Sequence, residues 1–206
     1  VGAGRTEIVR AIYGADYIRS KEIVIDGKSV RIAGPLDGKA NGIGFVPEDR
    51  KQQGLALPFS VEQNISMANL SSIRKGVFLS PSLERKMALR EIDELHIKTP
   101  SPDTAVETLS GGNQQKCIIG RWLETKPRIL ILDEPTRGID VGAKCEIYML
   151  MKKAVEAGSS IILISSELPE VLNMSNRVLT IASGRITGEF DPEKSSAQEI
   201  MNMAIG

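Results

Sequence analysis

The sequence predicts an α/β fold with a mostly parallel central sheet. From residue 110 onward, helical patterns alternate with short strands, and those at 128–132 and 160–164 are strongly apolar. Strands that are apolar on both faces belong to parallel sheets that helices cover on both sides. A further strand is expected at 177–182. The intervening helices are expected at 112–125, 143–157 and 168–173.

Small antiparallel elements are expected near both ends of the chain. An Asp-Gly pair at 26–27 lies between two β-rich runs within residues 22–32, which is a strong hairpin signal. A Ser-Gly pair at 183–184 is expected to turn a second hairpin into 185–190. The remaining expected elements are a helix at 6–13 closed by Gly14, a buried strand at 42–46 and a helix from about 195.

Residues 61–99 contain two helical patterns, at about 61–74 and 82–96. Turn residues around Gly76 and Pro81 separate them. This stretch therefore predicts a helical insertion between the strands.

The charge balance limits the classes of partner. Lys+Arg and Asp+Glu are equal, at 26 each, so no basic excess indicates nucleic acid. The longest apolar runs are too short to span a bilayer. The two cysteines lack metal-type spacing and are expected to be reduced.

The most specific pattern lies at 109–116, where Ser110, Gly111 and Gly112 open an apolar helix. Backbone N–H groups at a helix N-terminus, together with the helix dipole, suit a phosphate. The alternative is an ordinary capped helix with Ser110 as the N-cap. The pattern resembles the signature motif of ABC ATPases, which contacts the γ-phosphate of ATP held by the opposite domain.

A second pattern places acidic residues at the end of an apolar strand. Asp133 and Glu134 follow four apolar residues, and ligands bind at such strand ends in open α/β sheets. A buried strand with a polar exit is the plainer alternative. The segment resembles a Walker B strand, which implies that Asp133 holds Mg²⁺ and that Glu134 orients or deprotonates the attacking water. The following residues, Gly138 to Asp140, resemble the D-loop.

The start of the chain matches the end of a phosphate loop, G-x-x-x-x-G-K-[ST]. The matching residues are Gly2, Ala3, Gly4, Arg5 and Thr6, with arginine in place of the usual lysine. The threonine keeps the hydroxyl that binds Mg²⁺, whereas the planar guanidinium differs from a compact ammonium. We expect the leading glycine and the strand before it to lie upstream of this sequence.

Two further residues depart from the ABC pattern. Glu48 stands where the Q-loop usually has glutamine, and its carboxylate could bind Mg²⁺ but would repel unshielded phosphate. Ser166 stands where the switch histidine usually contacts the γ-phosphate. A serine hydroxyl can donate one hydrogen bond but carries no positive charge.

In their order, these motifs resemble the second half of the fused ATP-binding proteins of bacterial monosaccharide importers. The resemblance implies a P-loop NTPase of the ABC type over 1–206, incomplete at its N-terminus. It also implies a mostly parallel central sheet, a small antiparallel β part and a helical signature subdomain at about 61–125.

The resemblance also implies that two ATP sites are shared between the two halves of the polypeptide. ATP and Mg²⁺ would bind at the phosphate loop, with Thr6, Asp133 and Glu48 as metal ligands and Glu134 and Ser166 as catalytic residues. Signature residues would complete the ATP site of the N-terminal half of the same polypeptide, and the chain's own altered site would turn over poorly. The signature residues are Ser110, Gly111, Gly112 and Gln114, and Asp140 belongs to the D-loop.

The expected partners are that N-terminal half, permease subunits and, indirectly, a sugar-binding protein, at the cytoplasmic face of the bacterial inner membrane. Three alternatives stay open. The chain could be a nucleotide-binding regulatory half without hydrolysis of its own, or part of a nucleoside-type importer. An ABC ATPase that acts on DNA or ribosomes is disfavoured by the neutral charge.

Overall fold

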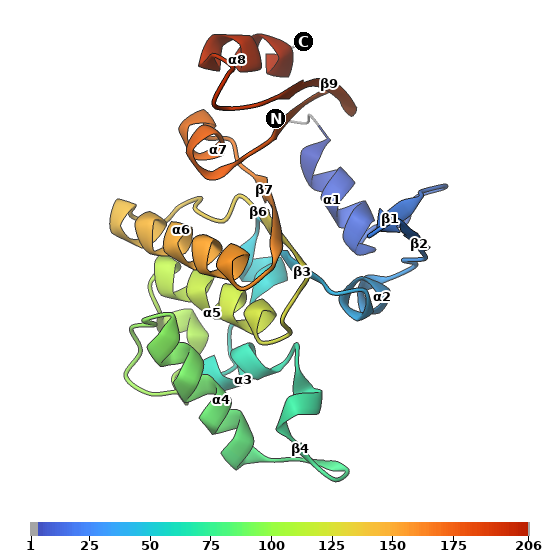
Figure 1. The fold of residues 1–206 in the computed structure, drawn as a ribbon. Coiled ribbons are helices and arrows are strands. Elements are labelled where there is room, and N and C mark those ends of the chain that lie inside the picture. Colours follow the sequence, from blue (N-terminus) through green and yellow to red (C-terminus); the bar gives the residue numbers. More distant parts are fainter. Residues whose placement is uncertain (1–3, 206) are drawn as a thin grey trace. The chain divides into compact units, whose positions relative to one another are not determined.

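The computed structural model describes residues 4–205 and divides into two compact units. One unit is Gly42–Ile161, and the other combines Val1–Asn41 with Ile162–Gly206. Each unit has helices and strands of its own (Figure 1). Within residues 4–205, no helix is both long and apolar enough to cross a membrane.

A three-stranded sheet has the order β3 (Ile43–Val46), β6 (Ile129–Asp133), β7 (Ser160–Ile164). The boundary between the two units falls inside β7. β3 and β6 run parallel, and their register pairs Val46 with Leu132. Every residue of β3 is buried, as are the last four residues of β6. The apolar runs of β3 and β6 therefore correctly predicted buried parallel strands, whereas only Ile164 is buried in β7.

Three helices of the Gly42–Ile161 unit pack together: α3 (Val61–Ser66), α4 (Pro81–Glu94) and α5 (Gly111–Leu123) (Figure 1). α3 begins with a capping box, in which the Ser60 hydroxyl accepts from the Gln63 N–H at 3.2 Å. The unit also contains a π-helical turn η1 (Arg50–Gly54), 3₁₀ turns η2 (Leu70–Ile73) and η3 (Val106–Thr108), a hairpin of β4 (Arg74–Lys75) and β5 (Phe78–Leu79), and α6 (Val141–Glu156).

The predicted helix at 61–74 is too long, because α3 ends at Ser66. Ser72 donates to the Asn69 carbonyl from both its N–H, at 3.1 Å, and its hydroxyl, at 2.7 Å. The Ser71 hydroxyl also bonds to the Asn69 side chain at 3.1 Å. Such local side-chain bonds compete with the helical pattern, which explains why a 3₁₀ turn replaces the second half of the predicted helix.

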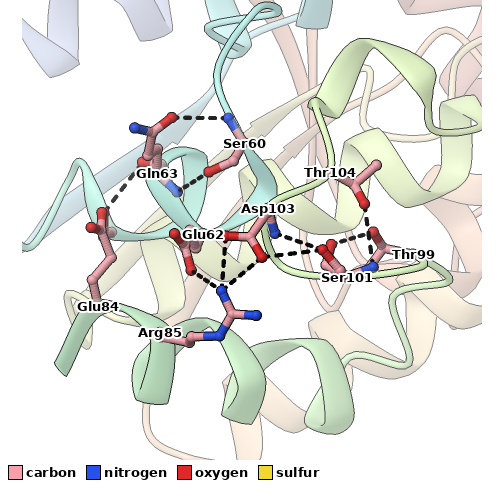
Figure 2. A network of polar contacts seen from close by, with 10 residues as sticks. Ser60, Glu62, Gln63, Glu84, Arg85, Thr99, Ser101, Asp103 and Thr104 are labelled. Atoms are coloured by element: carbon pink, nitrogen blue, oxygen red, sulfur yellow. Dashed lines mark hydrogen bonds and ion pairs between the residues drawn. The ribbon is translucent and has the colours of Figure 1, made fainter. Parts of the chain in front are cut away.

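Polar side chains connect α4 to α3 and to the segment that contains Asp103 (Figure 2). Arg85 on α4 donates to both carboxylate oxygens of Asp103, at 2.8 and 2.7 Å, and lies 3.6 Å from the Glu62 carboxylate on α3. The hydrogen bond from Arg85 holds the pKa of Asp103 below its usual value. Because Arg85 and Asp103 are exposed to solvent, their ion pair contributes little to stability and mainly fixes the orientation of the two side chains.

Arg121 on α5 is a buried cation, 8% exposed. Its guanidinium donates to the Asn64 carbonyl at 2.6 Å, the Asn64 side-chain oxygen at 2.8 Å and the Gly54 carbonyl at 2.5 Å. Burial lowers the pKa of Arg121 to about 10. This one side chain therefore joins α5 to α3 and to the end of η1.

We expect the stability of the Gly42–Ile161 unit to fall as the pH rises, because Glu91 on α4 is buried beside Glu124. Burial, and then the hydrogen bond to Glu124, raise the pKa of Glu91 to about 8. A raised folded-state pKa gives stability that is fully present below the unfolded pKa. That stability declines by up to about 1.4 kcal/mol per pH unit and is lost once the pH passes the folded value.

Urea unfolding of the wild type and of Glu91→Gln between about pH 5 and pH 9 measures this effect. Glutamine does not titrate, so the free energy of unfolding of the Glu91→Gln variant should change less with pH than that of the wild type. Identical profiles for the two proteins would contradict the assignment.

The other unit begins with α1 (Arg5–Tyr13), which ends at Gly14 in the left-handed conformation, at φ 88°. The Asp-Gly hairpin joins β1 (Ile23–Ile25) to the antiparallel β2 (Lys28–Val30), as predicted. Helix α2 (Pro35–Ala40) was not predicted. A Cβ on Gly38 would lie 2.4 Å from the Tyr13 carbonyl oxygen, so only glycine allows this contact with α1.

The last elements of this unit are α7 (Leu168–Met174), β8 (Val178–Ala182), β9 (Arg185–Phe190) and α8 (Ala197–Ile205). β8 and β9 form the predicted hairpin, and α8 packs against both strands. Among the strands described, β8 pairs only with β9. Ser183 and Gly184 turn the chain between the two strands through left-handed φ values of 49° and 72°.

Candidate functional site

The signature segment lies where the sequence predicts, at the start of α5. Ser110 is extended, and its carbonyl accepts the first helical hydrogen bond from the Gln114 N–H at 2.9 Å. Its hydroxyl does not cap the helix but accepts from the Asn113 side chain at 2.9 Å. The first amides of a helix lack intrahelical partners, so the N-terminus of α5 has the chemistry of an anion site.

Two residues of the signature helix have evident packing roles. A Cβ on Gly112 would lie 2.5 Å from the Ala143 Cβ, so α5 and α6 touch without an intervening side chain. Gln114 is buried, and its amide donates to the carbonyls of Val106 at 3.2 Å and Glu107 at 3.4 Å. Gln114 therefore holds η3 against α5, and its contact with a nucleotide stays a prediction.

The acidic pair lies directly after β6. Asp133 is 0% exposed at the carboxyl end of the strand. Glu134 follows in the left-handed region at φ 47°, where a residue with a Cβ is strained. Other described non-glycine residues share this region, among them Asp26 and Ser183 in turns, so the catalytic role of Glu134 stays a prediction.

Glu48 reaches the same edge of the sheet, because β3 and β6 are parallel neighbours whose carboxyl ends coincide. Its carboxylate forms an ion pair with Arg137, from the turn after β6. The sequence alone did not predict this ion pair, since 89 positions separate the two residues. An exposed cation thus lies beside the carboxylate that replaces the usual glutamine.

The D-loop-like segment joins β6 to α6. The Asp140 carboxylate accepts from the Ala143 N–H at 2.9 Å and caps α6. Arg50, which no sequence motif singled out, donates to the Arg137 carbonyl at 2.9 Å and to the Gly138 carbonyl at 3.4 Å. Asp140 therefore has a structural role, and its contact with another domain stays a prediction.

In the other unit, Gly4 has a left-handed φ of 88° and directly precedes α1. The Arg5 guanidinium donates to the Ser165 carbonyl at 3.0 Å, and Thr6 is half-buried in the first helical turn. Ser166 is exposed. The structure thus brings the substituted lysine position next to the substituted switch, while the predicted residues Gly2 and Ala3 lie outside the described range.

The comparisons with known proteins show the family and the fold. The chain belongs to the ABC transporter family, whose model matches residues 1–137. Two solved ABC structures share the fold. One is the ATP-binding cassette MJ0796 in a post-hydrolysis state bound to ADP and Pi, with a TM-score of 0.76, 22% identity and coverage of 92% of this chain and 81% of that chain. The other is cbiO1 from Clostridium perfringens, with a TM-score of 0.75, 24% identity and coverage of 97% and 77%.

Curated relatives are more similar in sequence. The chain is 47% identical to the ribose import ATP-binding protein of Bacillus cereus over 206 residues, which is 100% of this chain and 42% of the relative. It is 48% identical to a putative ribose/galactose/methyl galactoside import ATP-binding protein of Rhizobium etli, over 100% of this chain and 39% of that protein. The chain thus spans less than half the length of these relatives, and it matches their C-terminal half.

Proposed function

We propose that this chain is the second nucleotide-binding half of an ABC importer for a monosaccharide. The observation that carries the proposal is the 47% identity over all 206 residues to a ribose import ATP-binding protein. In this proposal, residues 1–206 form one ABC ATPase domain, with a helical subdomain at about 61–125. Its partners are a first ATPase half, permease subunits and an extracytoplasmic sugar-binding protein, and it works at the cytoplasmic face of the inner membrane.

The signature would serve an ATP bound by the first half. Ser110, Gly111 and Gly112 lie at the N-terminus of a helix of 13 residues, where backbone N–H groups and the helix dipole favour phosphate. Closure of the two halves around ATP would then drive the permease between its conformations. The exposed position of Ser110 supports this role, because a partner-bound phosphate needs access to the segment.

The chain's own nucleotide would be held by the residues around Gly4, Arg5 and Thr6, with Mg²⁺ near Thr6, Asp133 and Glu48. The buried Asp133 carboxylate and the Thr6 hydroxyl are suitable ligands for Mg²⁺, because this ion keeps several waters and needs few protein ligands. The ion would supply charge neutralisation for the phosphates. Glu134 would orient the attacking water.

Turnover at this second site would be weak. Arg5 already donates to the Ser165 carbonyl, and Glu48 already pairs with Arg137. Ser166 offers a hydroxyl where a histidine would carry positive charge. These contacts also support the alternative of a regulatory half that binds nucleotide without hydrolysing it.

We expect the 206-residue chain alone to hydrolyse ATP on the order of 10²-fold more slowly than the complete gene product. The reason is that the chain lacks an opposing signature and carries an altered phosphate loop. Phosphate release by the chain and by its Glu134→Gln variant measures this, with binding of a fluorescent ATP analogue as a control for folding. Fast phosphate release that Glu134→Gln abolishes would contradict weak turnover.

The proposed transport of a monosaccharide is tested by sugar-stimulated ATP hydrolysis. The complete gene product, reconstituted with its permease, should hydrolyse ATP faster when a sugar-loaded binding protein is added. A panel of pentoses, hexoses and nucleosides identifies the substrate class. Stimulation by nucleosides but not by sugars would replace the sugar assignment with a nucleoside-type importer.

A further inference from the structure

The Arg50 side chain lies where three segments of the Gly42–Ile161 unit meet. Its guanidinium donates to the carbonyls of Arg137 and Gly138, at 2.9 and 3.4 Å. Its Nη2 would lie 2.8 Å from a Cβ placed on Gly111, so it lies directly against the first glycine of the signature. The same Cβ position is 3.4 Å from the Gly138 carbonyl oxygen.

From these contacts, we propose that Arg50 is a positioning residue that sets the distance between the D-loop segment and the signature. The inference rests on the proposed role of the signature in a shared ATP site. In that site, the signature and the D-loop must reach the opposing half together. Arg50 would act through backbone carbonyls and the α5 N-terminus, without contacting the nucleotide.

The segment that carries Arg50 is itself fixed at both ends. Asp49 accepts from the N–H groups of Lys51 and Gln52, both at 3.0 Å, and so caps the π-helical turn η1. At the other end, the Gly54 carbonyl accepts from Arg121 on α5. η1 therefore holds Arg50 in place relative to α5.

The turn is also packed tightly against α5. A Cβ on Gly54 would lie 2.7 Å from a methyl group of Ile118, so no larger residue fits without a shift. One end of η1 is thus tied to the middle of α5, while Arg50 at its other end touches the start of the same helix. Movement of the D-loop relative to the signature would have to break the bonds made by Arg50.

The chemistry of arginine suits this position. Its planar fork reaches two carbonyl oxygens at once and keeps its charge at every physiological pH. A cation beside the N-terminus of α5 also adds positive potential where the partner's phosphate would bind. A lysine would keep the charge but could not hold both carbonyls in a fixed geometry.

The test compares Arg50→Ala and Arg50→Lys in the complete gene product reconstituted with its permease. The matched control is Lys51→Ala, because Lys51 is an exposed cation in the same turn. We expect Arg50→Ala to lower kcat about 10-fold while the KM for ATP changes less than about 2-fold, because the nucleotide still binds at the partner's phosphate loop. Arg50→Lys should recover less than half of the lost rate, and Lys51→Ala should match the wild type.

Hydrogen exchange of the backbone amides of 137–140 and 111–113 provides the readout that separates positioning from folding. Arg50→Ala should speed exchange in both segments, with little change elsewhere. Unchanged exchange, an unchanged kcat, or full rescue by lysine would each overturn the proposal. If the wild type shows no transport-coupled ATPase, the proposed function fails, while the exchange result still decides whether Arg50 fixes the two segments.

Discussion

Gly111→Asp is expected to lower ATP turnover by the assembled importer by a factor of about 10²–10³. The new carboxylate would stand at the N-terminus of α5, where the partner's phosphate is proposed to bind. Because Arg50 Nη2 would lie only 2.8 Å from the added Cβ, the carboxylate would also pair with Arg50. Phosphate release and trapping of nucleotide at each of the two sites measure the effect.

The matched control is Gly111→Asn, which has nearly the same size but no charge. If charge repulsion is the cause, the asparagine variant should keep substantially more activity than the aspartate variant. Nucleotide trapping at the site of the first half should fall more than nucleotide trapping at the site of this chain. Equal loss at both sites would contradict a signature that serves the opposing half.

Arg121→Met is expected to lower the free energy of unfolding by about 3 kcal/mol. Methionine keeps most of the side-chain volume but removes the guanidinium donors of the Gly54 and Asn64 carbonyls, and it leaves the Asn64 side-chain oxygen only the Ala56 N–H as a donor. Buried acceptors without donors are costly, whereas the loss of an exposed arginine is not. Urea unfolding of the variant and the wild type gives the difference.

Arg31→Met is the control, because Arg31 is exposed and the same chemical change should cost less than about 0.5 kcal/mol there. The loss in the free energy of unfolding for Arg121→Lys should lie between those of Arg121→Met and Arg31→Met, since one ammonium cannot reach all three acceptors. A loss at Arg121 no larger than at Arg31 would show that the buried network contributes no net stability.

The sequence predicted the strands and turns of this chain well, because those signals are local. The apolar runs that became β3 and β6 need no distant partner to be recognised as buried strands. Likewise, the Asp-Gly turn at 26–27 and Gly14 at the end of α1 follow from backbone preferences alone. The order of the motifs was enough to predict the family.

The side-chain contacts of the candidate site could not be predicted in the same way. The pairing of Glu48 with Arg137 and the bond from Arg5 to Ser165 join positions 89 and 160 residues apart. Each depends on how the elements pack, and no local preference encodes it. The contacts of Arg50 also join distant segments, so the sequence did not predict them. A charged residue outside a regular helix or strand is usually expected to be solvated.

The contact between Gly112 and Ala143 restricts which side chains these two positions can hold. The two positions share a space that holds one methyl group, because a second Cβ would lie 2.5 Å from the first. A change to a larger residue at either position therefore requires a smaller one at the other, or a shift of a whole helix. We therefore expect changes at these two positions to be coupled, so that a larger residue introduced at one of them alone would be harmful in this chain.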